Sequence, residues 1–476
     1  MSRAQDSLFS SQYFESNLKS SLEFNHEKAV ILGMAYFSCT VGAGFASGQE
    51  MLQYYAAFGG WGILGAIIAL ALMPLIAMIA MQYGSYFQAT SHDRVFTSVT
   101  SKVLARFIDY TITFTQFCIS FVMLAGAGAN LTQQFGTPLW FGSGLMAAAV
   151  IVCGFFNVEK VTNILGSITP FIVVLLLIVS VYSYLNPPAD IGAAFQFAQD
   201  NVSTTLPNWW VSTFNYVGIA MMGGISMGII MGGDMLDLKT AGRGGMIGGL
   251  LFGILLVMMV IAILFSSESV YDAALPTLSL ITEISQPLGV FSAVIIYIMI
   301  FSTALGNFYS LSRRVVAKKP ERFHTALILL VVIGFALSFM DFATLVGWVF
   351  PVTGYMALVM IVVLIWTWLS RGRSEMTEEM KRRDKIRNLA LRMIDPKQKF
   401  TTAHRRQLSE EIMDSNLAGR KLEKVAISEA VEELAADEES GFDPEEFTPP
   451  QSVIIHSSSP QAQNPDAEAK SEPTDN

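Results

Sequence analysis

Charged residues are scarce in this sequence: Asp, Glu, Lys and Arg make up 14% of its 476 residues, whereas hydrophobic residues make up 52%. Soluble domains usually carry about 25% charged residues, so this composition excludes an ordinary soluble protein. It predicts an integral membrane protein instead. Residues 1–27 are polar and contain no apolar core, so we expect no signal peptide ahead of the first apolar segment.

Cysteine and histidine are scarce as well. The three cysteines, Cys39, Cys118 and Cys153, fall inside apolar segments and have neither disulfide nor metal-site spacing. The five histidines are scattered, and none falls in the core of an apolar segment. Because no His, Cys or paired-carboxylate cluster is expected at membrane depth, the sequence argues against an enzyme and against a histidine proton relay.

Lysine and arginine are missing from every second loop between the apolar segments. Ten segments have about the length that a helix needs to cross a bilayer. They are 28–59, 60–86, 103–131, 138–155, 158–185, 207–236, 242–266, 288–312, 323–340 and 342–370. If the N-terminus lies inside, all 30 Lys and Arg fall on the inner side, and the charged residues of the outer loops are all acidic. The positive-inside rule therefore predicts ten spans with both termini in the cytoplasm.

The net charge of −9 comes from the end of the chain. We expect a cytoplasmic N-terminal arm (1–27), a ten-helix body (28–370), a basic and partly helical segment (371–425) and an acidic tail (426–476). The basic segment is expected to lie against the anionic inner leaflet. The tail holds 13 acidic residues and one lysine and is rich in Ser, Pro and Gln, which is typical of disorder. Its partner, if it has one, is unknown.

Glycines interrupt two of the ten segments at matching positions. Gly42-Ala43-Gly44 lies near the middle of the first segment, and Met222-Gly223-Gly224 lies near the middle of the sixth. The two sites divide the body into repeats 28–185 and 207–370. Because each repeat holds five segments, the second enters the membrane inverted, and inverted repeats with discontinuous helices are typical of secondary transporters. We therefore predict an all-α membrane fold, a 5+5 inverted repeat with discontinuous helices 1 and 6.

Such breaks predict a binding site for a small zwitterionic solute. N–H groups freed where a half-helix begins attract a carboxylate, and carbonyls freed where one ends attract an ammonium group. The candidate solute-binding residues are Gly42, Ala43, Gly44, Phe45, Met222, Gly223, Gly224 and, in the third segment, Gln116.

Glu50 is the acidic residue closest to the first break. It lies ~10 Å from Ala43 toward the outside if the chain between them is helical. A carboxyl group there could bind a proton or form part of an outer gate, and it could equally accept hydrogen bonds from a neighbouring helix. Both the functional and the structural interpretation stay open.

The motif from Gly42 to Glu50, with the aromatic-rich stretch 52–59 after it, resembles the YkvI-like amino-acid permeases. These bacterial proteins are grouped with the amino acid–polyamine–organocation superfamily. The resemblance covers about residues 28–370 and implies the LeuT fold in a bacterial cytoplasmic (inner) membrane. It says little about which solute is bound.

The LeuT fold further implies a sodium site between helices 1 and 8. By this resemblance, the ligands are the carbonyls of Ser38, Val41 and Met299 and the hydroxyls of Ser302 and Thr303. Uncharged oxygens suit a hard monovalent cation. The alternative is that the two hydroxyls bond back to carbonyls of their own helix, as hydroxyls in spanning helices often do.

The pattern and the resemblance together predict a sodium-coupled secondary transporter of a small zwitterionic solute, an amino acid by analogy. Alternatives are proton-coupled or uncoupled transport of another small solute, and a non-transporting receptor or scaffold with the same fold. The expected partners are the solute and the lipid bilayer. No nucleic acid is expected, and no cofactor apart from the coupling sodium ion.

Overall fold

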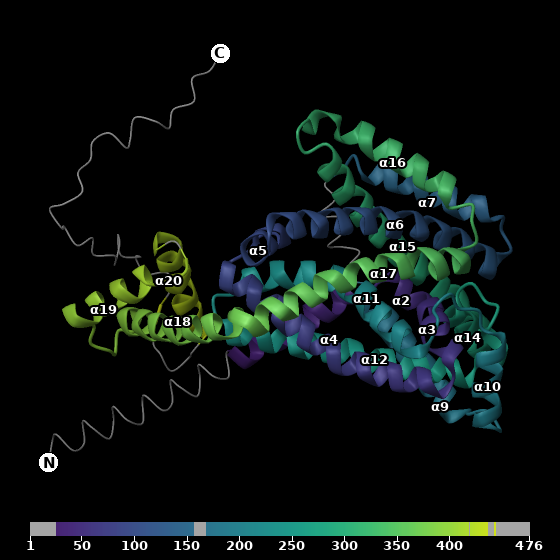
Figure 1. Cartoon of the computed structure of the whole chain (residues 1–476), viewed down its shortest axis with the longest axis horizontal. Coiled ribbons are helices and arrows are strands. Elements are labelled where there is room, and N and C mark those ends of the chain that lie inside the picture. Colours follow the sequence, from purple (N-terminus) through teal and green to yellow (C-terminus); the bar gives the residue numbers. More distant parts are fainter. Residues whose placement is uncertain (1–24, 157–167, 418, 437–441, 444–476) are drawn as a thin grey trace. The chain divides into compact units, whose positions relative to one another are not determined.

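The structure is a computed structural model in which the regular elements are helices (Figure 1). It describes residues 25–156, 168–417, 419–436 and 442–443. The chain divides into two compact units, 1–378 and 379–476, which are treated separately below. Most of the predicted N-terminal arm lies outside the described residues.

Seven helices of the described chain are long and apolar enough to cross a membrane. They are α4 (Gly60–Phe87), α6 (Lys102–Phe135), α11 (Trp209–Gly233), α12 (Leu238–Phe265), α15 (Gln286–Val315), α16 (Phe323–Leu337, or Pro320–Leu337 with the turn before it) and α17 (Phe342–Thr367). Two shorter apolar helices are α7 (Leu139–Cys153) and α9 (Thr169–Leu185). Each predicted segment after the first thus contains an apolar helix, and the number of ten crossings stays a prediction.

Short elements connect these helices. They are α5 (His92–Val99), α10 (Ile191–Asn201), α13 (Ser267–Val270), α14 (Pro276–Ile284) and the 3-10 turn η2 (Pro320–Arg322). Five residues of π-helix, η3 (Trp368–Gly372), follow α17.

The first predicted segment is discontinuous, as the sequence predicted. Residues 25–40 are helical, residues 41 and 42 leave the helix, and three short elements follow. These are α2 (Ala43–Ser47), α3 (Gln49–Tyr54) and η1 (Ala56–Phe58). Gly48 joins α2 to α3 with a φ of 81°, a left-handed conformation that glycine adopts without a steric penalty. The chain therefore breaks twice, at Gly42 and at Gly48.

The predicted break in the sixth segment is wrong. The helix α11 runs without interruption through Met222, Gly223 and Gly224. A glycine costs a helix only about 1 kcal/mol relative to alanine, and here the glycines permit close packing. A Cβ atom on Gly224 would lie 2.6 Å from the hydroxyl of Tyr36 in helix 25–40. Helix 6 is therefore continuous because its small residues fit against its neighbours.

Pro351 lies in the middle of α17 and does not end it. Proline has no N–H, so the carbonyl of Gly347 loses its donor within the helix. The hydroxyl of Thr205, in the loop before α11, donates to this carbonyl instead. One turn later, Asn215 Nδ2 of α11 donates to the carbonyl of Pro351 at 2.8 Å. The carbonyl that loses its helical donor is thus satisfied by Thr205 from outside the helix, and Asn215 adds a second bond from α11.

The helices of the first unit form two packed groups. In one, α4 packs against both α11 and α12, and helix 25–40 packs against α12 through Gly33, Gly244 and Gly248. In the other, α6 packs against α7, α15 and α16, which lie together in the upper part of Figure 1. The discontinuous segment lies between these groups, since α2 contacts α15 and α3 contacts α12.

The second unit contains most of α18 (Arg373–Ile394), followed by α19 (Thr402–Met413) and α20 (Gly419–Ala436). Ala390 and Ile394 pack against Ala430 and Leu434, and Arg387 forms an ion pair of 2.6 Å with Glu433.

This packing corrects the predicted start of the disordered tail at residue 426. Residues 426–436 are helical because their apolar face is buried on α18. The rest of the predicted tail lies outside the described residues, apart from 442 and 443.

Candidate functional site

The beginning of α2 leaves backbone donors free. Gly42 precedes the helix in an extended conformation (φ −93°, ψ 175°), and no side chain caps the helix. The first N–H groups of a helix have no partner within it, which here concerns Ala43, Gly44 and Phe45. These are the donors that the sequence predicted for a solute carboxylate.

The four predicted glycines have different surroundings. A Cβ atom on Gly42 or on Gly223 would meet no atom within 4 Å, so both positions face open space. A Cβ atom on Gly44 would collide with the carboxyl group of Glu50, and one on Gly224 with Tyr36. Gly42 and Gly223 are therefore accessible to a ligand, whereas Gly44 and Gly224 have packed neighbours. Met222, beside them on α11, is buried.

Gln116 lies between two helices. Its Nε2 donates to Ser310 Oγ of α15 at 3.3 Å. Its Oε1 is buried without a partner among the described residues. The side chain thus links α6 to α15, and contact with a solute stays a prediction.

The predicted sodium ligands come from two segments. Ser38 and Val41 lie at the end of helix 25–40, where the last helical bond runs from Val41 N–H to the Phe37 carbonyl at 3.0 Å. The carbonyls after it have no helical donor. Met299, Ser302 and Thr303 lie on α15. In α15, which is described throughout, neither hydroxyl bonds back to a helix carbonyl, so both remain available as ligands.

Glu50 is a buried acid on α3, with 8% of the residue exposed. Its carboxyl group lies against Gly44 and beside the hydroxyl of Tyr216 on α11. Tyr54 and Tyr55 also lie within electrostatic reach of it. Their ring centroids lie 5.6 and 5.2 Å from that of Tyr216. We call Tyr54, Tyr55 and Tyr216 the tyrosine cluster.

The sequence carried a partial signal for this cluster. Tyr54 follows Glu50 by four residues, so the two share a face of a helix. Tyr216 comes from a segment more than 160 residues away, and no local pattern connects it to Glu50. The cluster was therefore missed as a unit.

A polar cavity of about 310 Å³ lies on the predicted outer side. Gln49 and Gln53 of α3 line it together with the acids Asp272 and Asp341. Gln53 Nε2 donates to the carbonyl of Ala343 at 2.9 Å. No Lys or Arg lines this cavity, so its electrostatic potential favours cations.

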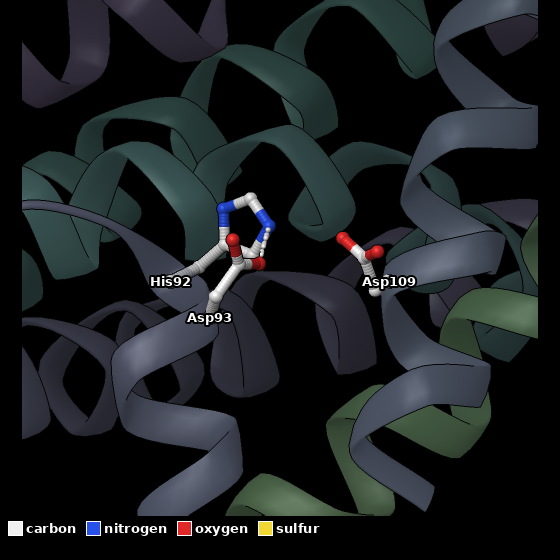
Figure 2. Close-up of side chains that lie close together, drawn as sticks. All are labelled: His92, Asp93 and Asp109. Atoms are coloured by element: carbon white, nitrogen blue, oxygen red, sulfur yellow. Dashed lines mark ion pairs between the residues drawn. The ribbon is translucent and has the colours of Figure 1, made fainter. Parts of the chain in front are cut away.

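On the predicted inner side, His92 and Asp93 of α5 lie opposite Asp109 of α6 (Figure 2). Their potential ligand atoms lie within 4.8 Å of one another, a separation that a metal ion could bridge. Arg314 of α15 lies among them, however, with Nη1 2.6 Å from Asp109 Oδ1 and Nη2 2.8 Å from His92 Nε2. A guanidinium group in this position opposes a metal cation, so the cluster is an ion-pair network between helix ends.

The network affects the charge of Asp93. His92 Nε2 lies 2.9 Å from Asp93 Oδ1. The hydrogen bond with His92, together with the charges of His92 and Arg314, lowers the pKa of the Asp93 carboxyl. The sequence did not predict this network, because Arg314 lies more than 200 residues from both of its partners.

Comparisons with known proteins place the chain among membrane proteins. No family model matches it. It is 21% identical over 356 residues to the uncharacterised membrane protein YkvI of Bacillus subtilis. The aligned region covers 74% of this chain and the whole of the relative. The predicted resemblance to the YkvI-like proteins is confirmed. A second relative is the uncharacterised protein YyaD of the same organism, 24% identical over 328 residues, with 68% of this chain and 92% of the relative covered.

The fold is likewise similar to a solved structure. The crystal structure of MhsT in complex with L-phenylalanine gives a TM-score of 0.50 at 16% identity, covering 85% of this chain and 97% of that one. This similarity shows a LeuT-like fold. Together with the apolar helices and the similarity to a membrane protein, it makes the chain a multi-pass membrane protein.

Proposed function

We propose that the protein is a secondary transporter of a small zwitterionic solute, an amino acid, with sodium as the coupling ion. The observation that carries this proposal is the break at Gly42 inside a LeuT-like fold. A discontinuous helix in a membrane needs a neighbouring cavity or protein partner for its freed backbone groups. Gly42 faces open space, which supports a ligand on that side.

In this proposal the solute carboxylate binds the free N–H groups at the start of α2. The continuity of α11 removes the freed carbonyls that the sequence predicted there for the ammonium group. The carbonyls at the end of helix 25–40 remain, and a helix C-terminus carries partial negative charge. The solute ammonium therefore binds near residues 38–41, with Gly223 leaving space on the α11 side.

Sodium binds in the proposal between this same helix end and α15. The hydroxyls of Ser302 and Thr303 are free of helix carbonyls, which supports their role as ligands beside the carbonyls of Ser38, Val41 and Met299. Five uncharged oxygens are typical of a site for a hard monovalent cation. Because solute and ion share the end of one helix, binding of either one organises the site for the other.

Transport then requires that the two helix groups move against each other. The group of helix 25–40, α4, α11 and α12 meets the group of α6, α7, α15 and α16 through the broken segment and through α17, which packs against both α11 and α6. Solute and sodium shift this equilibrium only through different affinities for its two states.

The test is uptake by the purified protein in proteoliposomes. Radiolabelled amino acids, with L-phenylalanine first, are supplied with and without an inward sodium gradient, and protein-free liposomes serve as the control. We expect accumulation that depends on the gradient. Loss of the two hydroxyls in the double variant Ser302→Ala/Thr303→Ala should remove the sodium stimulation.

The alternatives give different results. Full sodium-dependent uptake by the double variant would contradict the sodium site, and uptake that ignores sodium would favour the proton-coupled or uncoupled alternative. A folded protein that transports none of the amino acids would favour the receptor or scaffold alternative.

A further inference from the structure

The short helix α3 has two different faces. Gln49, Leu52 and Gln53 line the polar outer cavity. Glu50 and Tyr54 lie four residues apart and therefore share another face, which is buried. Glu50 thus does not line the polar cavity, but it directly follows Gln49, which does.

The environment of Glu50 contains hydroxyl groups and no basic residue. Tyr216 comes from α11, and Tyr355 of α17 is an electrostatic neighbour of Tyr54. Against α2 and α3, α17 contributes Phe350, α14 contributes Thr277 and α12 contributes apolar side chains. Among the described residues, no Lys, Arg or His forms an ion pair with Glu50 or acts on it electrostatically.

These surroundings fit a proton better than a larger cation. A buried carboxylate without a countercharge carries a large desolvation cost, and protonation removes it. A solute ammonium group would need space beside the carboxyl, but Gly44 already contacts it. The hydroxyls of Tyr54, Tyr55 and Tyr216 are buried without hydrogen-bond partners among the described residues. A hydroxyl both donates and accepts, so it serves the charged and the neutral carboxyl alike.

We propose that Glu50 is a proton-binding site that exchanges with the outer cavity, so that a proton accompanies the solute during transport. The proton passes from water in the cavity to a Glu50 carboxyl oxygen and leaves to water when the other side opens. No other bond is made or broken. This inference rests on the proposed function for its role in transport, whereas the binding of the proton is measurable without any solute.

The first experiment measures protonation directly. Infrared difference spectra of the full-length protein in lipid nanodiscs are recorded across pH, and the C=O band of a protonated carboxylic acid is followed. We expect a titrating band in the wild type and in Glu268→Gln, which removes an exposed acid. The band should be missing in Glu50→Gln and present at a shifted position in Glu50→Asp. An unchanged titrating band in Glu50→Gln would overturn the proposal.

The tyrosine cluster supplies a second measurement. Tyr216→Phe removes a hydroxyl beside the Glu50 carboxyl and should therefore change the midpoint of the band. An unmoved midpoint would contradict the arrangement of proton site and cluster.

The coupling is then tested in proteoliposomes that contain a pH-sensitive dye. The wild type should acidify the lumen when L-phenylalanine or another transported amino acid is added outside, and Glu50→Gln should transport without acidification. Equal acidification by both would overturn the coupling. If the wild type transports no amino acid but shows the Glu50-dependent band, the proposed function fails and the proton site stands.

Discussion

The first and sixth helices both carry clustered glycines at mid-length, yet only the first is broken. In the first, Gly48 takes a left-handed conformation and Gly42 faces open space. In α11, Gly224, Gly228 and Gly232 recur every four residues and lie on one face. Small residues at this spacing are typical of close helix packing in membranes. The comparison teaches that glycine permits a break, whereas its spacing and neighbours decide whether one forms.

The largest effect is expected from a substitution that disfavours the second break of the first helix, at Gly48. Gly48→Val places a β-branched residue at a φ of 81°, which costs about 1–3 kcal/mol. Its Cβ would also lie 2.5 Å from Thr277 Oγ1. We expect loss of uptake in proteoliposomes and a clear fall in the thermal unfolding temperature. Wild-type stability and uptake would mean that the joint between α2 and α3 has no importance.

A smaller effect is expected where a glycine of α11 serves packing. In Gly224→Ala the new methyl group would lie 2.6 Å from the Tyr36 hydroxyl, and overpacking of this kind costs about 1–3 kcal/mol. Adding Tyr36→Phe removes the hydroxyl and should recover part of the loss. The measurement is a double-mutant cycle of unfolding free energies. Strictly additive effects would contradict contact between the two residues.

Gly223→Ala is the matched control on the same helix. Its methyl group meets no atom within 4 Å, and alanine favours a continuous helix by up to about 1 kcal/mol. We expect an equal or slightly higher unfolding temperature. A marked loss of stability would indicate that α11 is broken in solution after all, and would restore the symmetry of the two helices.

The smallest effect is expected far from both glycine clusters, at Asp93. Because its pKa lies below the ordinary value of 3.8, its stabilising contribution is present above that pH and is lost as the pH falls through the lowered value. The side chain is 55% exposed, so Asp93→Asn should cost well under about 1 kcal/mol near neutral pH. Unfolding measured across pH checks this, and a difference that grows toward acid pH would contradict it.

The sequence was a good guide where the signal is local. Apolar runs located the helices, and the break at Gly42 followed from glycine in an apolar segment that also carries Glu50. The second break at Gly48 was not predicted; there the chain packs closely against Thr277, a residue far away in the sequence.

Prediction failed where distant residues decide. In the continuous helix α11, Gly224 packs against Tyr36, almost 190 residues earlier. The pairing of Arg314 with Asp109 and the contact of Glu50 with Tyr216 likewise join segments that no periodicity connects. Residues 426–436 were predicted to be disordered because the segment is acidic. They are helical, and their apolar face packs against α18, a contact that the local composition does not indicate.

The proline in α17 has a mechanical consequence. A helix that lacks one rung of its hydrogen-bond ladder bends most easily at that rung. Here the unpaired carbonyl of Gly347 is held by Thr205, and the carbonyl of Pro351 by Asn215. Bending α17 at this point therefore pulls on the loop before α11 and on α11 itself. We therefore expect a tilt of α17 to be coupled to α11 through these two hydrogen bonds.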